Sequence, residues 1–120
     1  MLCRRDPDGP RTAREWVADQ FGDDLDILVL EAVQLIVSEL VTNAIVHAHG
    51  EVEVCITTPP GAVRIEVIDQ TPDRAPEIRP LDGVFAANGR GLRMVEGFSR
   101  SWGVRAGDHS KVVWAEVRNS

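Results

Sequence analysis

The stretch DDLDILVLEAVQLIVSELVTNAIVHAHG, residues 23–50, carries the strongest secondary-structure pattern of the chain. Its apolar residues recur at three- and four-residue steps, which is the period of one face of an α-helix. The four-residue series consists of Leu28, Ala32, Ile36, Leu40 and Ala44. The acidic residues Asp23, Asp24 and Asp26 favour a helix N-terminus, and Gly50 is typical of a helix end. The pattern predicts one long helix in this stretch.

The flanking sequence predicts a helix before this stretch and a hairpin after it. Residues 10–21 have apolar residues near helical spacing, with Pro10 in the first turn and Gly22 as a stop signal. Residues 1–9 are expected to be a loose lead-in or a short edge strand. Residues 51–58 and 62–69 alternate apolar and polar side chains, and the PPG turn between them predicts an antiparallel hairpin.

The last third of the chain predicts a loop, a short helix and a second hairpin. Residues 70–90 lose all periodicity, and a loop of that length inside a compact domain is often a functional lid. GLRMVEGFS at residues 91–99 predicts a short helix, and SWGVRA at 101–106 and KVVWAEV at 111–117 predict a second hairpin. Strands grouped as hairpins beside a few helices favour an α+β sandwich over an alternating parallel sheet.

Length and composition narrow the class of protein. The 120 residues fit a single domain, and the formal net charge of −6 with scattered basic residues argues against nucleic-acid binding. Cys3 and Cys55 lack a metal-binding pattern and are expected to be free thiols in a reducing cytoplasm. The first ten residues show no signal-peptide pattern, and polar residues interrupt the apolar stretch 25–48, so no membrane span is expected.

Glu39, Asn43 and His47 form a polar row along the predicted long helix, because residues four apart lie on the same helix face. From spacing alone we favour the simpler interpretation, in which this row faces water. In the functional interpretation, Asn43 contributes an oxygen to a hard metal ion and Glu39 orients a water or a hydroxyl.

Two further motifs have both a structural and a functional interpretation. Asp69 ends a predicted strand, where a carboxylate can accept a hydrogen bond from an exocyclic amine or simply begin a turn. Gly89 and Gly91 flank Arg90 ahead of the predicted short helix. Glycines let the backbone approach a ligand, and a helix N-terminus attracts phosphate, although a flexible junction has the same sequence pattern. The motif is not a P-loop, because no GK[ST] follows.

The order of these motifs resembles that of a known superfamily. ELVTNAIVHA (39–48), VIDQTP (67–72), a proline-rich loop and GRGLRMV (89–95) are similar to the N, G1 and G2 boxes of the GHKL, or Bergerat-fold, ATPases. Within that superfamily the chain most resembles the small anti-sigma-factor serine kinases and their stand-alone actinobacterial relatives. The resemblance covers most of the chain and implies a two-layer sandwich, a mostly antiparallel sheet covered on one face by helices.

The resemblance also implies a role for each candidate residue. Asn43 would ligate the Mg²⁺ that bridges the phosphates of ATP, and Glu39 would act as the polarising base on the attacking hydroxyl or water. Asp69 would accept the adenine amino group, and residues 70–90 would form the ATP lid. The other nucleotide contacts that the resemblance implies are His47, Thr71, Gly89, Arg90, Gly91 and Leu92.

The G1 box departs from the superfamily pattern. It usually reads D-x-G-x-G, whereas Thr71 and Asp73 stand at the two glycine positions of this chain. A side chain there can narrow the adenine pocket, although the Thr71 hydroxyl can still donate a hydrogen bond.

The function implied by the resemblance is a cytoplasmic, ATP-dependent serine kinase of the anti-sigma type. It would bind a sigma factor in one state and phosphorylate an anti-anti-sigma protein in another, and it can form a homodimer. Two alternatives stay open. The first is a non-catalytic, nucleotide-responsive module that sequesters a sigma factor or a related partner. The second, which we favour least, is the catalytic half of a split histidine kinase.

Overall fold

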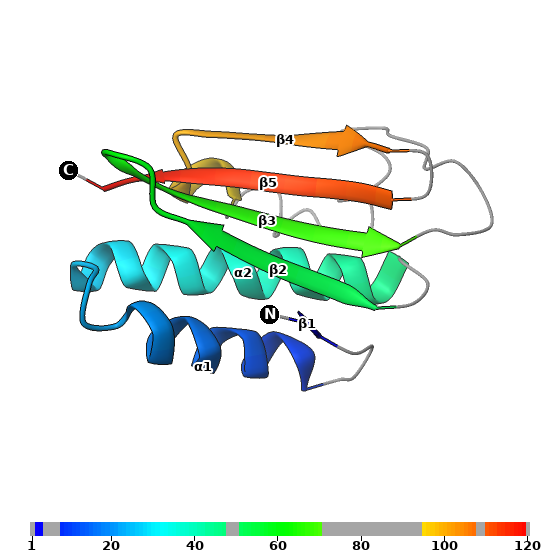
Figure 1. Cartoon of the computed structure of the whole chain (residues 1–120), viewed down its shortest axis with the longest axis horizontal. Coiled ribbons are helices and arrows are strands. Elements are labelled where there is room, and N and C mark those ends of the chain that lie inside the picture. Colours follow the sequence, from blue (N-terminus) through cyan, green and yellow to red (C-terminus); the bar gives the residue numbers. More distant parts are fainter. Residues whose placement is uncertain (1, 4–7, 48–50, 71–94, 108–109, 120) are drawn as a thin grey trace.

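The computed structural model describes residues 2–3, 8–47, 51–70, 95–107 and 110–119 (Figure 1). These ranges contain two helices, five strands and a short helical turn at residues 95–98. The elements in chain order are β1 (Leu2–Cys3), α1 (Gly9–Phe21), α2 (Ile27–His47), β2 (Val52–Thr57), β3 (Ala62–Gln70), β4 (Ser101–Ala106) and β5 (Ser110–Arg118).

The five strands form one antiparallel sheet in the order β1-β2-β3-β5-β4. Both predicted hairpins are confirmed, β2 with β3 and β4 with β5. The turn of the first hairpin contains Gly61, whose φ of 77° is a conformation that glycine adopts without strain. β5 lies between β3 and β4, so the two hairpins join along a ladder that runs from Ala62↔Arg118 to Gln70↔Ser110.

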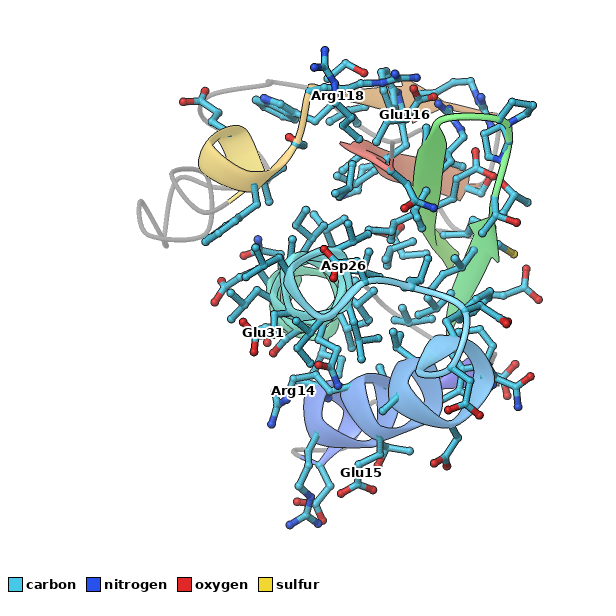
Figure 2. All side chains as sticks on the ribbon, turned by 90° about the vertical axis from the view of Figure 1, so that its left-hand side faces the viewer. Arg14, Glu15, Asp26, Glu31, Glu116 and Arg118 are labelled. Carbon is cyan, nitrogen blue, oxygen red and sulfur yellow. The ribbon has the colours of Figure 1, made fainter. Side chains whose placement is uncertain are left out.

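The helices cover one face of this sheet, which confirms the predicted two-layer α+β fold. α2 packs directly on β2, β3 and β5, and α1 packs against α2 (Figure 1). In β2, β3 and β5, alternate residues point toward the helices and most of them are buried, since strand side chains alternate between faces. Figure 2 shows the opposite sides of the sandwich, with Glu116 on the outer sheet face and Glu15 on the far side of α1. The core strand residues are Val52, Val54, Val63, Ile65, Val67, Val113, Ala115 and Val117.

α2 begins at Ile27, so the acidic residues before it lie ahead of the helix rather than inside its first turn. Asp26 stabilises this start, because its carbonyl accepts a hydrogen bond from Leu30 N at 2.8 Å and its Oδ1 accepts one from Ile27 N at 3.0 Å. α2 ends at His47, and Gly50 lies outside the described residues.

Leu28 does not share the buried face of α2 with the other members of the four-residue apolar series. Leu28 is 71% exposed, whereas Ala32, Ile36, Leu40 and Ala44 of the same series are buried. A strict four-residue series turns by about 40° per step around a helix of 3.6 residues per turn. Leu28 has therefore drifted off the face that the later members bury.

α2 is long and apolar enough over Ile27–Ile45 to cross a membrane by length and composition. Half of that window is buried inside the fold, as in the core helix of a soluble protein. Its buried face packs on the sheet and on α1, so the sandwich itself accounts for the apolar composition of the helix.

Candidate functional site

Asn43 lies near the C-terminal end of α2 and is only 3% exposed, so the interpretation in which it faces water is wrong. The apolar residues of the helix layer and the sheet surround this part of α2. The amide Nδ2 of Asn43 has no hydrogen-bond partner within the described part of the chain. A buried amide without a partner costs about 1–3 kcal/mol, so a group that is kept there is expected to have a ligand.

Asp69 lies near the C-terminal end of β3, on the strand face that packs against α2, and is 2% exposed. Its Oδ2 lies 3.4 Å from Nζ of Lys111, which stands directly opposite on β5. Its Oδ1 is buried and finds no hydrogen-bond donor among the described residues. Asp69 is thus a buried carboxylate with one oxygen paired and the other available.

Burial raises the pKa of the Asp69 carboxyl above its usual value, because desolvation disfavours the charged form. The Lys111 ammonium acts in the opposite direction, through its charge and its hydrogen bond. The same buried environment that raises the pKa strengthens any hydrogen bond that a ligand donates to Oδ1.

Lys111 is the residue of this site that sequence reasoning missed. It precedes Val113, Ala115 and Val117 at two-residue steps, and those three side chains point into the core. The alternation therefore places a lysine on the buried face of a strand, which is an unusual position for a charge. That pattern is visible in KVVWAEV and could have identified the residue.

Asn43 and Asp69 lie at the same end of the sandwich. In Figure 1, α2 and β3 both end on the right-hand side, where β5 begins. Glu39 is half-buried on α2, one turn before Asn43, as the predicted polar row requires. The structure therefore places Asn43 and Asp69 near the ends of α2 and β3, with Glu39 one turn before Asn43 and Lys111 beside Asp69.

The remaining predicted contacts are not described. The backbone of His47 ends α2, but its side chain lies outside the described part, as do Thr71, Gly89, Arg90, Gly91 and Leu92 and residues 71–90 of the predicted lid. Within the described ranges, no group of three or more His, Cys, Asp or Glu side chains is placed to hold a metal ion. Any cation at this end would depend on few protein ligands, as Mg²⁺ does when it is held largely by phosphates and waters.

A groove at another position lies between α1 and α2 (Figure 2). It contains none of the predicted site residues, and its lining residues are Arg14, Glu31, Gln34 and Leu35. Arg14 joins the two helices there, because its guanidinium donates to Ser38 Oγ at 2.7 Å and its carbonyl accepts a hydrogen bond from Gln34 Nε2 at 3.1 Å. These hydrogen bonds hold α1 against α2, so the residues that line the groove contribute to helix packing.

Solved structures with the same fold include a pair of RsbU and RsbW domains and two histidine kinases. The RsbU and RsbW domains of Rv1364c from Mycobacterium tuberculosis match at a TM-score of 0.69 and 18% identity, over 99% of this chain and 32% of that one. The histidine kinase domain of the blue-light activated kinase of Erythrobacter litoralis EL346 matches at 0.58 and 20%, over 92% and 59%. The histidine kinase AdeS of Acinetobacter baumannii matches at 0.59 and 14%, over 100% and 67%.

The TM-scores show a shared fold, and this chain spans about a third of the length of the first structure. A search of curated proteins found no match. A family model described as a histidine kinase-like ATPase domain matches residues 4–117, which is nearly the whole chain. The protein therefore belongs to the histidine kinase-like ATPase domain family.

Proposed function

We propose that the protein binds Mg-ATP at the end of the sandwich where Asn43 and Asp69 lie, and that it is a regulatory serine kinase of the anti-sigma type. The observation that carries this proposal is the pair of buried polar atoms, Asn43 Nδ2 and Asp69 Oδ1, that lack partners in the described structure. A fold without a ligand gains nothing from burying such groups, whereas a nucleotide offers donors and acceptors to both.

The free carboxylate oxygen of Asp69 is suited to the base. An exocyclic amino group of adenine donates N–H and would meet Oδ1, which is a buried acceptor. The amide of Asn43 is suited to the phosphate end, since its unpartnered Nδ2 can donate to a phosphate oxygen while its oxygen is a ligand that Mg²⁺ accepts. When bound, Mg²⁺ would neutralise phosphate charge, and Asn43 would hold it from the helix side.

Glu39 would act on the phosphoryl acceptor. It lies one turn before Asn43 on α2 and is half-buried, so its carboxylate is positioned on the same side of the helix as the proposed metal ligand. There it would orient a hydroxyl and accept its proton, while positioning and charge neutralisation supply most of the rate enhancement. In this proposal His47, Thr71, Gly89, Arg90, Gly91 and Leu92 bind the rest of the nucleotide, and residues 71–90 close over it. The predicted lid begins one residue too early, because Gln70 is the last residue of β3 and pairs with Ser110.

The likeness to a structure that contains an RsbW domain is in line with the anti-sigma assignment, and the other two listed structures, both histidine kinases, share the fold as well. In this proposal the protein binds a sigma factor and phosphorylates a serine or threonine of an anti-anti-sigma protein, in the cytoplasm. The non-catalytic, nucleotide-responsive module is the second candidate, favoured by Thr71 and Asp73 at the usual glycine positions of the G1 box.

The test is transfer of the γ-phosphate of labelled ATP to the anti-anti-sigma proteins of the same organism. Glu39→Ala is expected to lower the transfer rate by about 100-fold or more, because a positioned general base contributes that much. Glu31→Ala is the matched control, since Glu31 is an exposed glutamate of the same helix. Equal rates for wild type and Glu39→Ala would contradict the catalytic role, and ATP binding without any transfer would favour the second candidate.

A further inference from the structure

Lys111 is the only lysine of the chain, and it is largely buried beside the proposed base contact. Its side chain is 12% exposed, and its Nζ lies 3.4 Å from Asp69 Oδ2. The two residues are direct partners across β3 and β5, so strand pairing holds their side chains next to each other on one face of the sheet. The other basic side chains in the described ion pairs of the sheet are arginines on its outer face.

The pair has two consequences for Asp69. Lys111 holds Oδ2, which leaves Oδ1 as the oxygen that is open to a ligand. Lys111 is also the charged neighbour that lowers the pKa of Asp69, against the burial that raises it. A buried carboxyl without a counter-charge tends to take up a proton instead of staying ionised.

The charge state of Asp69 decides what the pocket can recognise. An ionised carboxylate only accepts hydrogen bonds, whereas a protonated carboxyl donates one and accepts others. An adenine base presents an amino donor beside the ring acceptor N1. An anionic Oδ1 binds the amino group in a charge-assisted bond, while a neutral carboxyl could donate to N1 and depend less on the amino group.

We propose that Lys111 is a specificity-determining residue of the nucleotide pocket. Its ammonium holds Oδ2 of Asp69 and balances the carboxylate charge, which leaves Oδ1 as a single anionic acceptor that selects a base bearing an amino group. This inference rests on the proposed function, because it assumes that Asp69 contacts the base. Lys111 would thus take part in base recognition by acting on Asp69, without contacting the base itself.

The selectivity test compares two ligands at saturating Mg²⁺, ATP and purine riboside triphosphate, which lacks the 6-amino group. Titration calorimetry at neutral pH gives the ratio of the two affinities for wild type, Lys111→Met and Lys111→Arg. Wild type is expected to prefer ATP by about tenfold or more, which corresponds to about 1.4 kcal/mol. The preference is expected to fall toward unity in Lys111→Met and to persist in Lys111→Arg, which keeps the counter-charge.

The affinity ratio separates this role from a structural one. A variant that only loosens the fold weakens both ligands alike and leaves the ratio unchanged. Lys111→Gln is the second neutral variant, and its amide can still donate to Oδ2 if Lys111→Met fails to fold. A wild-type ratio near unity, or a neutral variant that keeps the wild-type ratio, would overturn the inference. If the wild-type protein binds neither ligand, the proposed nucleotide-binding function is contradicted, and the inference about Lys111 fails with it.

A second measurement needs no nucleotide. Carbon-13 NMR follows the Asp69 carboxyl during a pH titration of the free protein and yields its pKa directly. Replacing Lys111 with Met or Gln is expected to raise that pKa, while Lys111→Arg leaves it close to the wild-type value. An Asp69 pKa that does not change in the neutral variants would show that Lys111 does not set the charge of the carboxyl, and would contradict the inference even if ATP binds.

Discussion

Asn43 on α2 and Asp69 on β3 are the two buried polar side chains in the described part of the protein, and each keeps one polar atom without a hydrogen-bond partner. The two residues lie near the C-terminal ends of α2 and β3, which belong to the two layers of the sandwich and end on the same side of it (Figure 1). Buried groups of this kind lower stability, so their shared location marks the end of the fold where a ligand is expected.

The first prediction concerns the stability cost of Asn43. Replacing it with leucine, which is similar in size and apolar, is expected to raise the free energy of unfolding of the ligand-free protein by about 1 kcal/mol, because an unpartnered buried amide is removed. The same variant should lose Mg-ATP binding. Urea denaturation measures the first effect. A loss of stability by more than about 1 kcal/mol would show that the amide has a structural partner.

The second prediction concerns the pH dependence of stability at Asp69. Burial raises the folded-state pKa of this carboxyl above the usual 3.8, so the folded protein holds its proton to higher pH than the unfolded chain does. The stabilisation is therefore complete below pH 3.8 and is lost as pH rises through the folded-state pKa. Relative to Asp69→Asn, wild type should lose stability as pH rises toward neutral, as measured by urea denaturation across that range.

Glu116 provides a control of opposite sign for this prediction. Hydrogen bonds from Arg100 and then Arg64 hold its pKa below the usual 4.5. Its contribution is therefore present above pH 4.5 and is lost as pH falls through the lowered folded-state pKa. Relative to Glu116→Gln, wild type should gain stability as pH rises over this acidic range. If Asp69→Asn and Glu116→Gln changed the pH dependence of stability in the same direction, the claim that burial and ion pairing act in opposite directions would be contradicted.

The third prediction concerns the outer face of the sheet, where Gly103 of β4 faces Trp114 of β5. A methyl group on Gly103 would lie 2.8 Å from the indole, which Arg64 covers from a distance of 4.4 Å to the ring centroid. Gly103→Ala is expected to lower the free energy of unfolding by about 1–3 kcal/mol, because the ring must move.

Gly97→Ala is the matched control for this steric effect. A methyl group at Gly97 meets no described atom within 4 Å, so the change is expected to be below about 1 kcal/mol and can be stabilising. Thermal or urea unfolding of both variants measures the difference. Equal effects of the two substitutions would show that Trp114 is free to move at no cost.

Much of the fold was predictable because it depends on local patterns. The alternation of residues 51–58 and 62–69 predicts β2 and β3, whose apolar residues are largely buried, and the period within residues 23–50 predicts the long helix. The adjacency of β3 and β5 was not predicted, because pairing between strands distant in sequence leaves no local signal. Leu28 shows the limit of a strict four-residue pattern, which turns away from the core over several steps.

The sequence identifies candidate site residues, but it does not predict how deeply they are buried or which residues lie next to them. The four-residue spacing predicts that Glu39 and Asn43 share a helix face, and it favoured the interpretation in which that face is exposed to water. Spacing alone cannot show that Asn43 is buried, because burial depends on how the sheet and α1 pack against α2. Asp69 was identified at a strand end, whereas its partner Lys111 is 42 residues away in sequence and adjacent only because β5 pairs with β3. The roles of His47, Thr71, Gly89, Arg90, Gly91 and Leu92 stay predictions.

The central claim, that Asn43 and Asp69 mark a Mg-nucleotide site, is tested most directly by titration calorimetry with a non-hydrolysable ATP analogue and Mg²⁺. Wild type is expected to bind one equivalent, and Asn43→Ala to bind at least about tenfold more weakly. The neighbouring control Thr42→Ala is expected to bind as wild type does, since Thr42 Oγ1 donates to the Ser38 carbonyl of its own helix. Wild type without measurable binding, or Asn43→Ala with wild-type affinity, would contradict the account.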